Sequence, residues 1–159
     1  MKYQFPVKPL AIGYNKLRSA GLVSTESSRF GMVRNAGTRP HQGIDLATPT
    51  IGYRCYAVDD AQVAVVRDVG AYGKQVVLKL DTHFFVFYAH LSRIDVTVGQ
   101  QIKAGTIVGL SGDTGNAKGM TTEILGSHLH FEVRIRALTG YGLDGRLDPL
   151  DYFQLDVTN

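Results

Sequence analysis

The sequence predicts a mainly β protein, built as a single antiparallel β-sheet domain with little helix. Three observations predict this class. Glycine supplies 18 of the 159 residues, above the usual share of about 7%, which is typical of a turn-rich β protein. Valine-rich and aromatic segments follow one another between residues 61 and 89, with a glycine-containing turn among them. Residues 128–136 alternate between apolar and polar side chains, which is the period of a β-strand.

The chain divides into an N-terminal extension and one main domain. Residues 1–23 contain two prolines and two glycines around a short helix expected near residues 15–20, and we expect this extension to pack on the main domain. The main domain covers residues 24–159, where short strands and turns follow one another. A chain of this length fits one domain and leaves little room for a second.

The elements of the main domain follow from local composition. Strands are expected at residues 61–67, 74–80, 84–89, 96–98, 106–110 and 128–136. The first two are rich in valine and the third in aromatic residues, which favour strands, and glycines bound the fourth and fifth. In the last strand, His128, His130, Glu132 and Arg134 share one face and apolar side chains share the other. Pro149 suits the first turn of a short helix at 148–153.

Composition excludes several classes of protein. Hydrophobic residues make up 44% of the chain, so disorder is excluded. Seventeen basic residues stand against fourteen acidic ones, scattered without a basic run, so we expect no nucleic-acid partner. No apolar run reaches the roughly 18 residues of a membrane-spanning helix, so we expect no membrane insertion. We also expect the chain to be a monomer. Cys55, the single cysteine, lies in an apolar segment and is expected to be a buried structural thiol.

Four of the five histidines occupy positions that indicate a site. His128 and His130 lie two residues apart on one strand face, roughly 6.6 Å apart along the strand, and that face is expected to look into a groove or solvent. His41 precedes Asp45 by four residues, and the two can converge if the chain bends at the glycine between them. His90 follows the aromatic strand, where a side chain can meet the rim of a cleft.

These residue types match a catalytic zinc site. Zinc takes nitrogen and oxygen ligands, and a catalytic zinc takes three protein ligands and a water. His41 and Asp45, together with one member of the His128/His130 pair, supply such a set, and the other member would stand beside the open position. The residues alone do not decide which member binds. Glu132 is expected to be a solvated carboxylate or one that contacts a ligand.

Other motifs have simpler interpretations. His83 follows Asp81 and Thr82 and is assigned to a hairpin turn. Residues 112–116 are rich in glycine but lack the Gly-Lys-Ser/Thr of a phosphate loop, so turn chemistry is favoured. A cupin barrel also binds metal through a His-x-His strand, but there the pair comes early, whereas here it comes late.

Taken together, the motifs identify a resemblance. They are Ser28-Arg29-Phe30-Gly31, His41-Gln42-Gly43-Ile44-Asp45, Tyr88-Ala89-His90-Leu91-Ser92, Ser111-Gly112-Asp113-Thr114-Gly115-Asn116 and His128-Leu129-His130-Phe131-Glu132-Val133-Arg134. In this order the chain resembles the lysostaphin/LytM-type zinc metallopeptidases over roughly residues 28–153. The resemblance implies a β-sheet groove, in which His41, Asp45 and His130 bind zinc. It also implies that His90 and His128 are catalytic histidines outside the ligand set.

The resemblance implies a zinc-dependent endopeptidase that hydrolyses peptide cross-links of bacterial peptidoglycan. The alternative is a non-catalytic module of the same fold that binds the cell wall or activates other hydrolases. The segment 117–127 is longer than usual in the family, so one wall of the groove is expected to differ. Residues 1–6 show no export signal. We therefore expect an enzyme carried by a phage or delivered by a secretion machine, acting outside the cytoplasm at the cell wall.

Overall fold

The computed structural model describes residues 25–152. Within this range the fold consists of strands joined by turns and short 3-10 helices, with no α-helix. The strands are β1 (Gly31–Arg34), β2 (Arg39–His41), β3 (Ile44–Ala47), β4 (Arg54–Tyr56), β5 (Ala61–Asp68), β6 (Lys74–Leu80), β7 (Phe85–Ile94), β8 (Gln101–Ile102), β9 (Ile107–Ser111), β10 (His128–Arg134) and β11 (Arg146–Leu147). The 3-10 helices are η2 (Thr25–Ser28), η3 (Gly70–Tyr72), η4 (Gly115–Ala117) and η5 (Pro149–Asp151). The expected extension 1–23, with its helix, lies outside the described residues.

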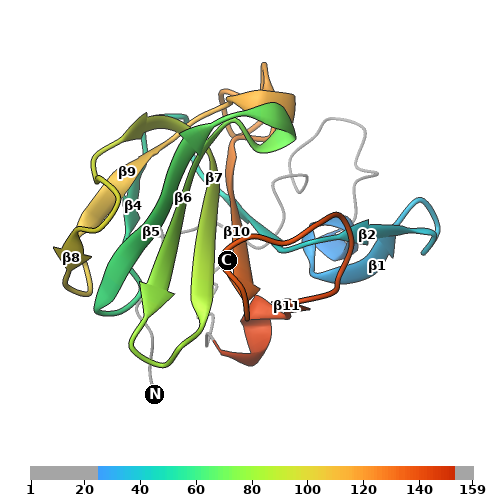
Figure 1. The fold of residues 1–159 in the computed structure, drawn as a ribbon. Coiled ribbons are helices and arrows are strands. Elements are labelled where there is room, and N and C mark those ends of the chain that lie inside the picture. Colours follow the sequence, from blue (N-terminus) through green and yellow to red (C-terminus); the bar gives the residue numbers. More distant parts are fainter. Residues whose placement is uncertain (1–24, 153–159) are drawn as a thin grey trace.

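One antiparallel sheet forms the body of the molecule. Its strands follow the order β11-β10-β7-β6-β5-β8, with β3 also paired to β10 and with β9 joining β7 to β4 (Figure 1). β1 and β2 form a separate antiparallel pair beside it. All of these pairings are antiparallel, so the predicted fold class is confirmed. Among the described residues, no helix is long and apolar enough to span a membrane.

The predicted strands agree with the structure where the residue pattern is strong. β5 and β6 match the two valine-rich segments, whereas β7 continues beyond the predicted end at residue 89 to Ile94. β10 ends at Arg134, two residues early: Ile135 is half exposed, and its amide donates to the carbonyl of Gly145 at 2.9 Å, outside the strand pairs. The strand predicted at 96–98 is wrong, since the backbone there forms a turn closed by the bond from the amide of Gln100 to the carbonyl of Thr97. The helix predicted at 148–153 is the single 3-10 turn η5.

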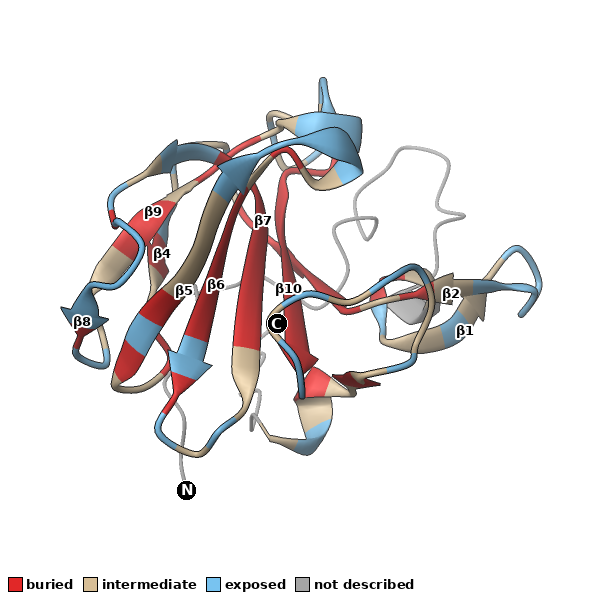
Figure 2. Ribbon diagram, viewed as in Figure 1, coloured by how far each residue is buried: buried red, intermediate tan, exposed pale blue. Residues whose placement is uncertain are grey.

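The main apolar core lies on one face of the sheet and a smaller cluster on the other. The larger cluster includes Leu78, Tyr88 and Phe131, all of them fully buried. The smaller cluster contains Val77, Phe87 and Ala89 from the opposite face of β6 and β7. In Figure 2 the buried colour runs along the central strands β6, β7 and β10. The predicted buried thiol, Cys55, is confirmed as part of the main core.

Both faces of β10 are buried, which corrects part of one expectation. The sequence predicts that the polar face of this strand looks into a groove or solvent. His128 and His130 do line a cleft, but the four polar side chains of this face are each at most 5% exposed, so none of them is solvated. They are covered because β10 is a central strand, paired to β7 along one side and to β3 and β11 along the other. The polar side chains therefore have to satisfy one another.

Candidate metal centre

Strand pairing brings Asp45 and His130 together. β3 runs antiparallel to β10, and Asp45 is the direct partner of His130 in the register. Gly43 allows this approach, since a Cβ there would lie 2.2 Å from the carbonyl oxygen of Phe131. The chain bends at Gly43, so His41 at the end of β2 turns toward the same point as Asp45. The glycine in this motif thus serves both a bend and close backbone packing.

Three side-chain atoms converge in a triangle. His130 Nδ1 lies 2.9 Å from Asp45 Oδ1 and 3.3 Å from His41 Nε2, and His41 Nε2 lies 3.2 Å from Asp45 Oδ1. Ligands held at 2.0–2.2 Å by a tetrahedral zinc are roughly 3.3–3.6 Å apart. All three residues are buried. Their ligand atoms lie within 4.8 Å of one another, close enough for a single metal ion to contact all of them. The donor set and its spacing therefore fit zinc.

Partners outside the triangle fix the orientation of its members. His41 Nδ1 donates to the carbonyl of Arg29 at 2.9 Å, which leaves Nε2 with a lone pair facing the triangle. Arg34 Nη2 donates to Asp45 Oδ2 at 3.0 Å, so Oδ1 is the oxygen that faces the two histidines. Such outer contacts orient metal ligands and set their tautomers.

The carboxylate of Asp45 is held in its charged form. Burial would raise its pKa, but the charges of His41 and His128 and the hydrogen bonds from His130 and His41 hold the pKa of Asp45 well below its usual range. For His130, burial is outweighed by the hydrogen bonds to Asp45 and Glu132, which raise its pKa to about 9. A metal ion at this site therefore competes with a proton on His130.

His128 and His90 lie beside the triangle without belonging to it. His128 Nε2 is 3.7 Å from Asp45 Oδ1, and the rings of His90 and His128 meet edge to face at 5.4 Å. The Nδ1 of His128 donates to the carbonyl of Gly126 and that of His90 to the carbonyl of Thr114, both at 2.8 Å. In both rings, Nε2 is therefore the nitrogen that can accept a proton.

Both histidines are neutral near pH 7. Burial, together with the charges of His130 and His128, lowers the pKa of His90 to about 3. Burial also lowers the pKa of His128, against the opposing charge of Asp45. A neutral imidazole with an unprotonated Nε2 is the form that a general base requires.

A β-bulge aims His90 into the cleft. Val86 and Tyr88 face the main core, and strict alternation would send His90 there too, yet the next core residue is Leu91. His90 has a φ of +58°, a left-handed conformation that is uncommon for residues other than glycine. The register of β7 shifts across His90 in its pairing with β6, between Tyr88 and Leu91, and again in its pairing with β9, between Leu91 and Arg93. Bulges of this kind redirect side chains next to functional sites.

The loop after β9 supports this bulge. The sequence assigns residues 112–116 to turn chemistry, and the structure agrees, but the loop also positions His90. Thr114 accepts from His90 through its carbonyl and donates from its hydroxyl to the carbonyl of Leu91 at 2.8 Å. Gly115 permits the close packing of η4 on η3, since a Cβ there would lie 2.2 Å from the carbonyl oxygen of Ala71.

Glu132 is the centre of a buried polar network. Its Oε1 accepts from His130 Nε2 at 2.9 Å and from the hydroxyl of Tyr72 at 2.6 Å. Its Oε2 accepts from Arg134 Nε at 2.6 Å and from Arg146 Nε at 2.8 Å. The side chain is fully buried, so the expectation of a solvated carboxylate is wrong, and Glu132 instead contacts His130, which is a predicted ligand. Despite burial, the bonds and charges of His130 and the two arginines hold the pKa of Glu132 far below its usual range.

Tyr72 and Arg146 were not identified from the sequence. Tyr72 lies in η3, stacks on the ring of His130 at 5.3 Å and bonds to Glu132. Arg146 Nη1 donates to the carbonyls of Gly140 and Gly142 at 2.6 and 2.7 Å, which ties the loop after β10 to Glu132. Only the placement of Glu132 on the same strand face as His130 pointed toward such partners.

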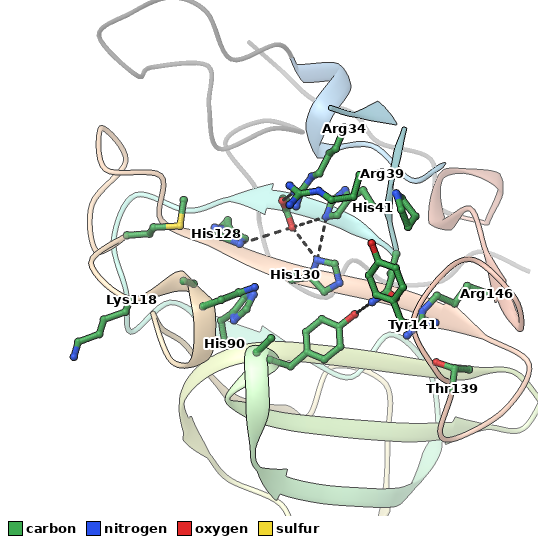
Figure 3. A pocket seen from close by; sticks show the side chains of 18 of the residues that line it. Arg34, Arg39, His41, His90, Lys118, His128, His130, Thr139, Tyr141 and Arg146 are labelled. Carbon is green, nitrogen blue, oxygen red and sulfur yellow. Dashed lines mark hydrogen bonds and ion pairs between the residues drawn. The ribbon is translucent and has the colours of Figure 1, made fainter. Parts of the chain in front are cut away.

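The five predicted site residues line one cleft of about 730 Å³. Figure 3 shows His41, His128 and His130 converging from β2 and β10, with His90 below them. The segment 117–127 contributes Ala117, Lys118 and Met120 to the wall of the cleft. Its second half pairs with residues 49–51 instead. His83 lies in the turn after β6 and is not among the residues that line the cleft.

Residues 39–143 match the sequence profile of peptidase family M23. This segment contains all five predicted site residues, namely His41, Asp45, His90, His128 and His130. The chain belongs to peptidase family M23. The resemblance to the lysostaphin/LytM-type enzymes is thereby confirmed.

Relatives of this M23 chain are known in sequence and in structure. It is 39% identical over 97 residues to peptidoglycan DD-endopeptidase ShyB of Vibrio cholerae, a match that covers 61% of this chain and 21% of ShyB. The catalytic domain of lysostaphin from Staphylococcus simulans is 25% identical with a TM-score of 0.61, and 79% of this chain and 87% of that domain are covered. A zinc-containing peptidase from Vibrio cholerae is 26% identical with a TM-score of 0.60, over 99% of this chain and 41% of that one. The chain thus spans about a fifth of the length of the curated relative.

Proposed function

We propose that this chain is a zinc-dependent endopeptidase that hydrolyses peptide cross-links of bacterial peptidoglycan. The observation that carries the proposal is the buried triangle of His41, Asp45 and His130, whose spacing matches the ligands of a tetrahedral zinc. Membership of a peptidase family and the zinc-containing relative support the metal. The name of the relative ShyB supports the substrate.

His41, Asp45 and His130 are proposed as the zinc ligands. Zinc in such a site polarises a peptide carbonyl and makes water more acidic. Arg34 keeps the second oxygen of Asp45 engaged, so the carboxylate presents one oxygen to the ligand position. Glu132 holds the ring of His130 through Nε2, so that its Nδ1 faces the same point.

His128 is proposed as the general base. Its Nδ1 is engaged with the carbonyl of Gly126, so Nε2 takes the proton from the attacking water and afterwards returns it to the leaving amine. Neither Asp45, which is held charged as a ligand, nor Glu132, which is saturated by four bonds, is available for that task. A base of this kind contributes about 10²–10⁴-fold to the rate.

His90 is proposed to orient the attacking water. A histidine at this position has two possible roles, orienting the attacking water or stabilising the oxyanion. Because its Nδ1 carries the proton that bonds Thr114 and its pKa is about 3, Nε2 can accept a hydrogen bond but cannot donate one. An oxyanion needs a donor, so the first role fits the neutral ring.

The cell wall outside the cytoplasm is the proposed place of action. The substrate lies there, and the relative ShyB is named for activity on peptidoglycan. The chain is proposed to act as a monomer, since the five site residues already meet in one cleft of a single chain and no residue of a second copy is required to bring them together.

Digestion of purified cell walls tests the proposed function. The zinc-loaded protein is expected to release peptide fragments whose new amino and carboxyl ends lie within cross-links, as read by mass spectrometry. An Asp45→Asn variant, which keeps the volume of the side chain, should release none. If no wall of any chemotype is cut, yet the protein increases cleavage by a second hydrolase, the non-catalytic module is the correct function.

A further inference from the structure

The cleft carries an excess of positive charge. Among the described residues that line it, four are cationic, namely Arg34, Arg39, Lys118 and Arg146, and only Asp45 is acidic. Arg34 is bonded to Asp45, and Arg146 is bonded to the buried Glu132. These two arginines are therefore already paired with carboxylates of the protein itself.

Arg39 and Lys118 are not paired with a carboxylate among the described residues. Both are exposed, and within residues 25–152 neither has a carboxylate at salt-bridge distance or a side-chain hydrogen bond. They come from different walls of the cleft, Arg39 from the start of β2 and Lys118 from the residue after η4. Figure 3 shows them on opposite sides of His90 and His128.

The chemistry of these side chains indicates what they recognise. The planar guanidinium of arginine matches a carboxylate through two parallel hydrogen bonds, while lysine presents a point charge. Two such cations on opposite walls of the cleft favour a substrate that carries negative charge on both sides of the bond to be cut. A neutral peptide would leave both without a partner.

We propose that Arg39 and Lys118 select cross-link peptides that carry free carboxylates beside the scissile amide. Peptides whose carboxylates are converted to carboxamides, and neutral glycine bridges, are then poorer substrates. This inference rests on the proposed function, since it names the substrate class of the same cleft. It assigns the discrimination to charge and not to the size of the cleft.

A matched pair of peptides tests the inference. Two cross-linked peptides that differ only in carboxylate against carboxamide at the flanking positions are digested by the zinc-loaded protein. We expect the carboxylate form to have a kcat/KM about 10-fold higher, the low end for hydrogen bonds to charged groups. Arg39→Gln and Lys118→Gln should each lower this ratio toward one, mainly through KM, and added salt should lower it as well.

Arg54→Gln and Lys79→Gln are the matched controls. Both residues are exposed and neither is among those that line the cleft, so the ratio should stay at the wild-type value. Zinc content and the midpoint of thermal unfolding should be equal in all four variants, which separates selection from a structural role.

Other outcomes overturn the inference in distinguishable ways. If the wild type cuts both peptides equally well, the inference fails while the proposed function stands. If it cuts neither peptide nor any cell wall, the proposed function fails as well. If Arg39→Gln and Lys118→Gln slow digestion of whole walls but leave the peptide ratio unchanged, the two cations bind an anionic wall polymer instead of the substrate peptide.

Discussion

The two faces of β10 are buried to the same degree and are stabilised in different ways. Leu129, Phe131 and Val133 pack into the main core, where contact with apolar neighbours is sufficient. His128 and Glu132 face the other way and are equally inaccessible, but a buried polar group is costly unless it is hydrogen-bonded. The polar face therefore needs a complete set of hydrogen-bonding partners, and His130 on this face is proposed to find one of them in a zinc ion shared with His41 and Asp45.

The largest expected effect comes from a residue of the polar face, and it is an effect on the rate of cleavage. His128→Ala should keep one zinc per chain and reduce cell-wall cleavage by about 10²–10⁴-fold, because it removes the proposed base without touching a ligand. Zinc content and cleavage are measured on the same preparation. Loss of the metal in this variant would show that His128 is a ligand, and unchanged cleavage would exclude it as the base.

On the apolar face the expected effect is on stability. Phe131→Ala removes a fully buried ring that meets Tyr88 edge to face at 5.3 Å, so the free energy of unfolding should fall by about 3–5 kcal/mol. Urea unfolding of the wild type and the variant gives the difference. A loss below about 1 kcal/mol would mean that this face does not act as a packed core.

A smaller effect is expected from the partner of His130. Glu132→Gln keeps the size of the side chain but removes the charge that holds His130 Nε2, so zinc affinity should fall by about 10–100-fold. Affinity is measured by competition with a chelator. Glu123→Gln, on the segment that pairs with residues 49–51, is the control and should bind as the wild type does. Equal affinity in both variants would show that Glu132 serves only the fold.

The smallest effect concerns Cys55 in the main core. Burial raises the pKa of its thiol from 9.0 to about 12, so below pH 9 the folded protein should not react with a thiol reagent, and one thiol should react after unfolding. Because the folded-state pKa is the higher one, this group favours the folded state below pH 9, and that contribution is lost as the pH rises toward 12. Rapid labelling of the native protein at pH 8 would contradict the burial of Cys55.

The strands that could be predicted from the sequence are those whose residue pattern lies within one short segment. The valine-rich strands β5 and β6 and the alternation of β10 are periodic patterns of one short segment, so they could be predicted. β1 to β4 are strands of three or four residues, too short to show a period, and β2 contains a proline. The strand predicted at 96–98 failed because three residues with two valines also fit a turn whose Val96 is buried.

In the candidate site, too, the local patterns could be predicted and the contacts between distant residues could not. The spacing of His41 and Asp45 and the shared face of His128 and His130 were visible in the sequence. The register that places Asp45 opposite His130 joins residues 85 positions apart, and no local pattern carries it. The left-handed backbone at His90 and the bond from Arg146 to Glu132 likewise arise only from packing.

Zinc stoichiometry tests the central claim most directly. Elemental analysis of the protein after purification with zinc, beside His130→Ala and His128→Ala prepared in parallel, measures whether the triangle is the metal site. We predict one zinc per chain in the wild type and in His128→Ala, and none in His130→Ala. A wild type without stoichiometric metal, or a His130→Ala variant that retains it, would contradict the assignment of His41, Asp45 and His130.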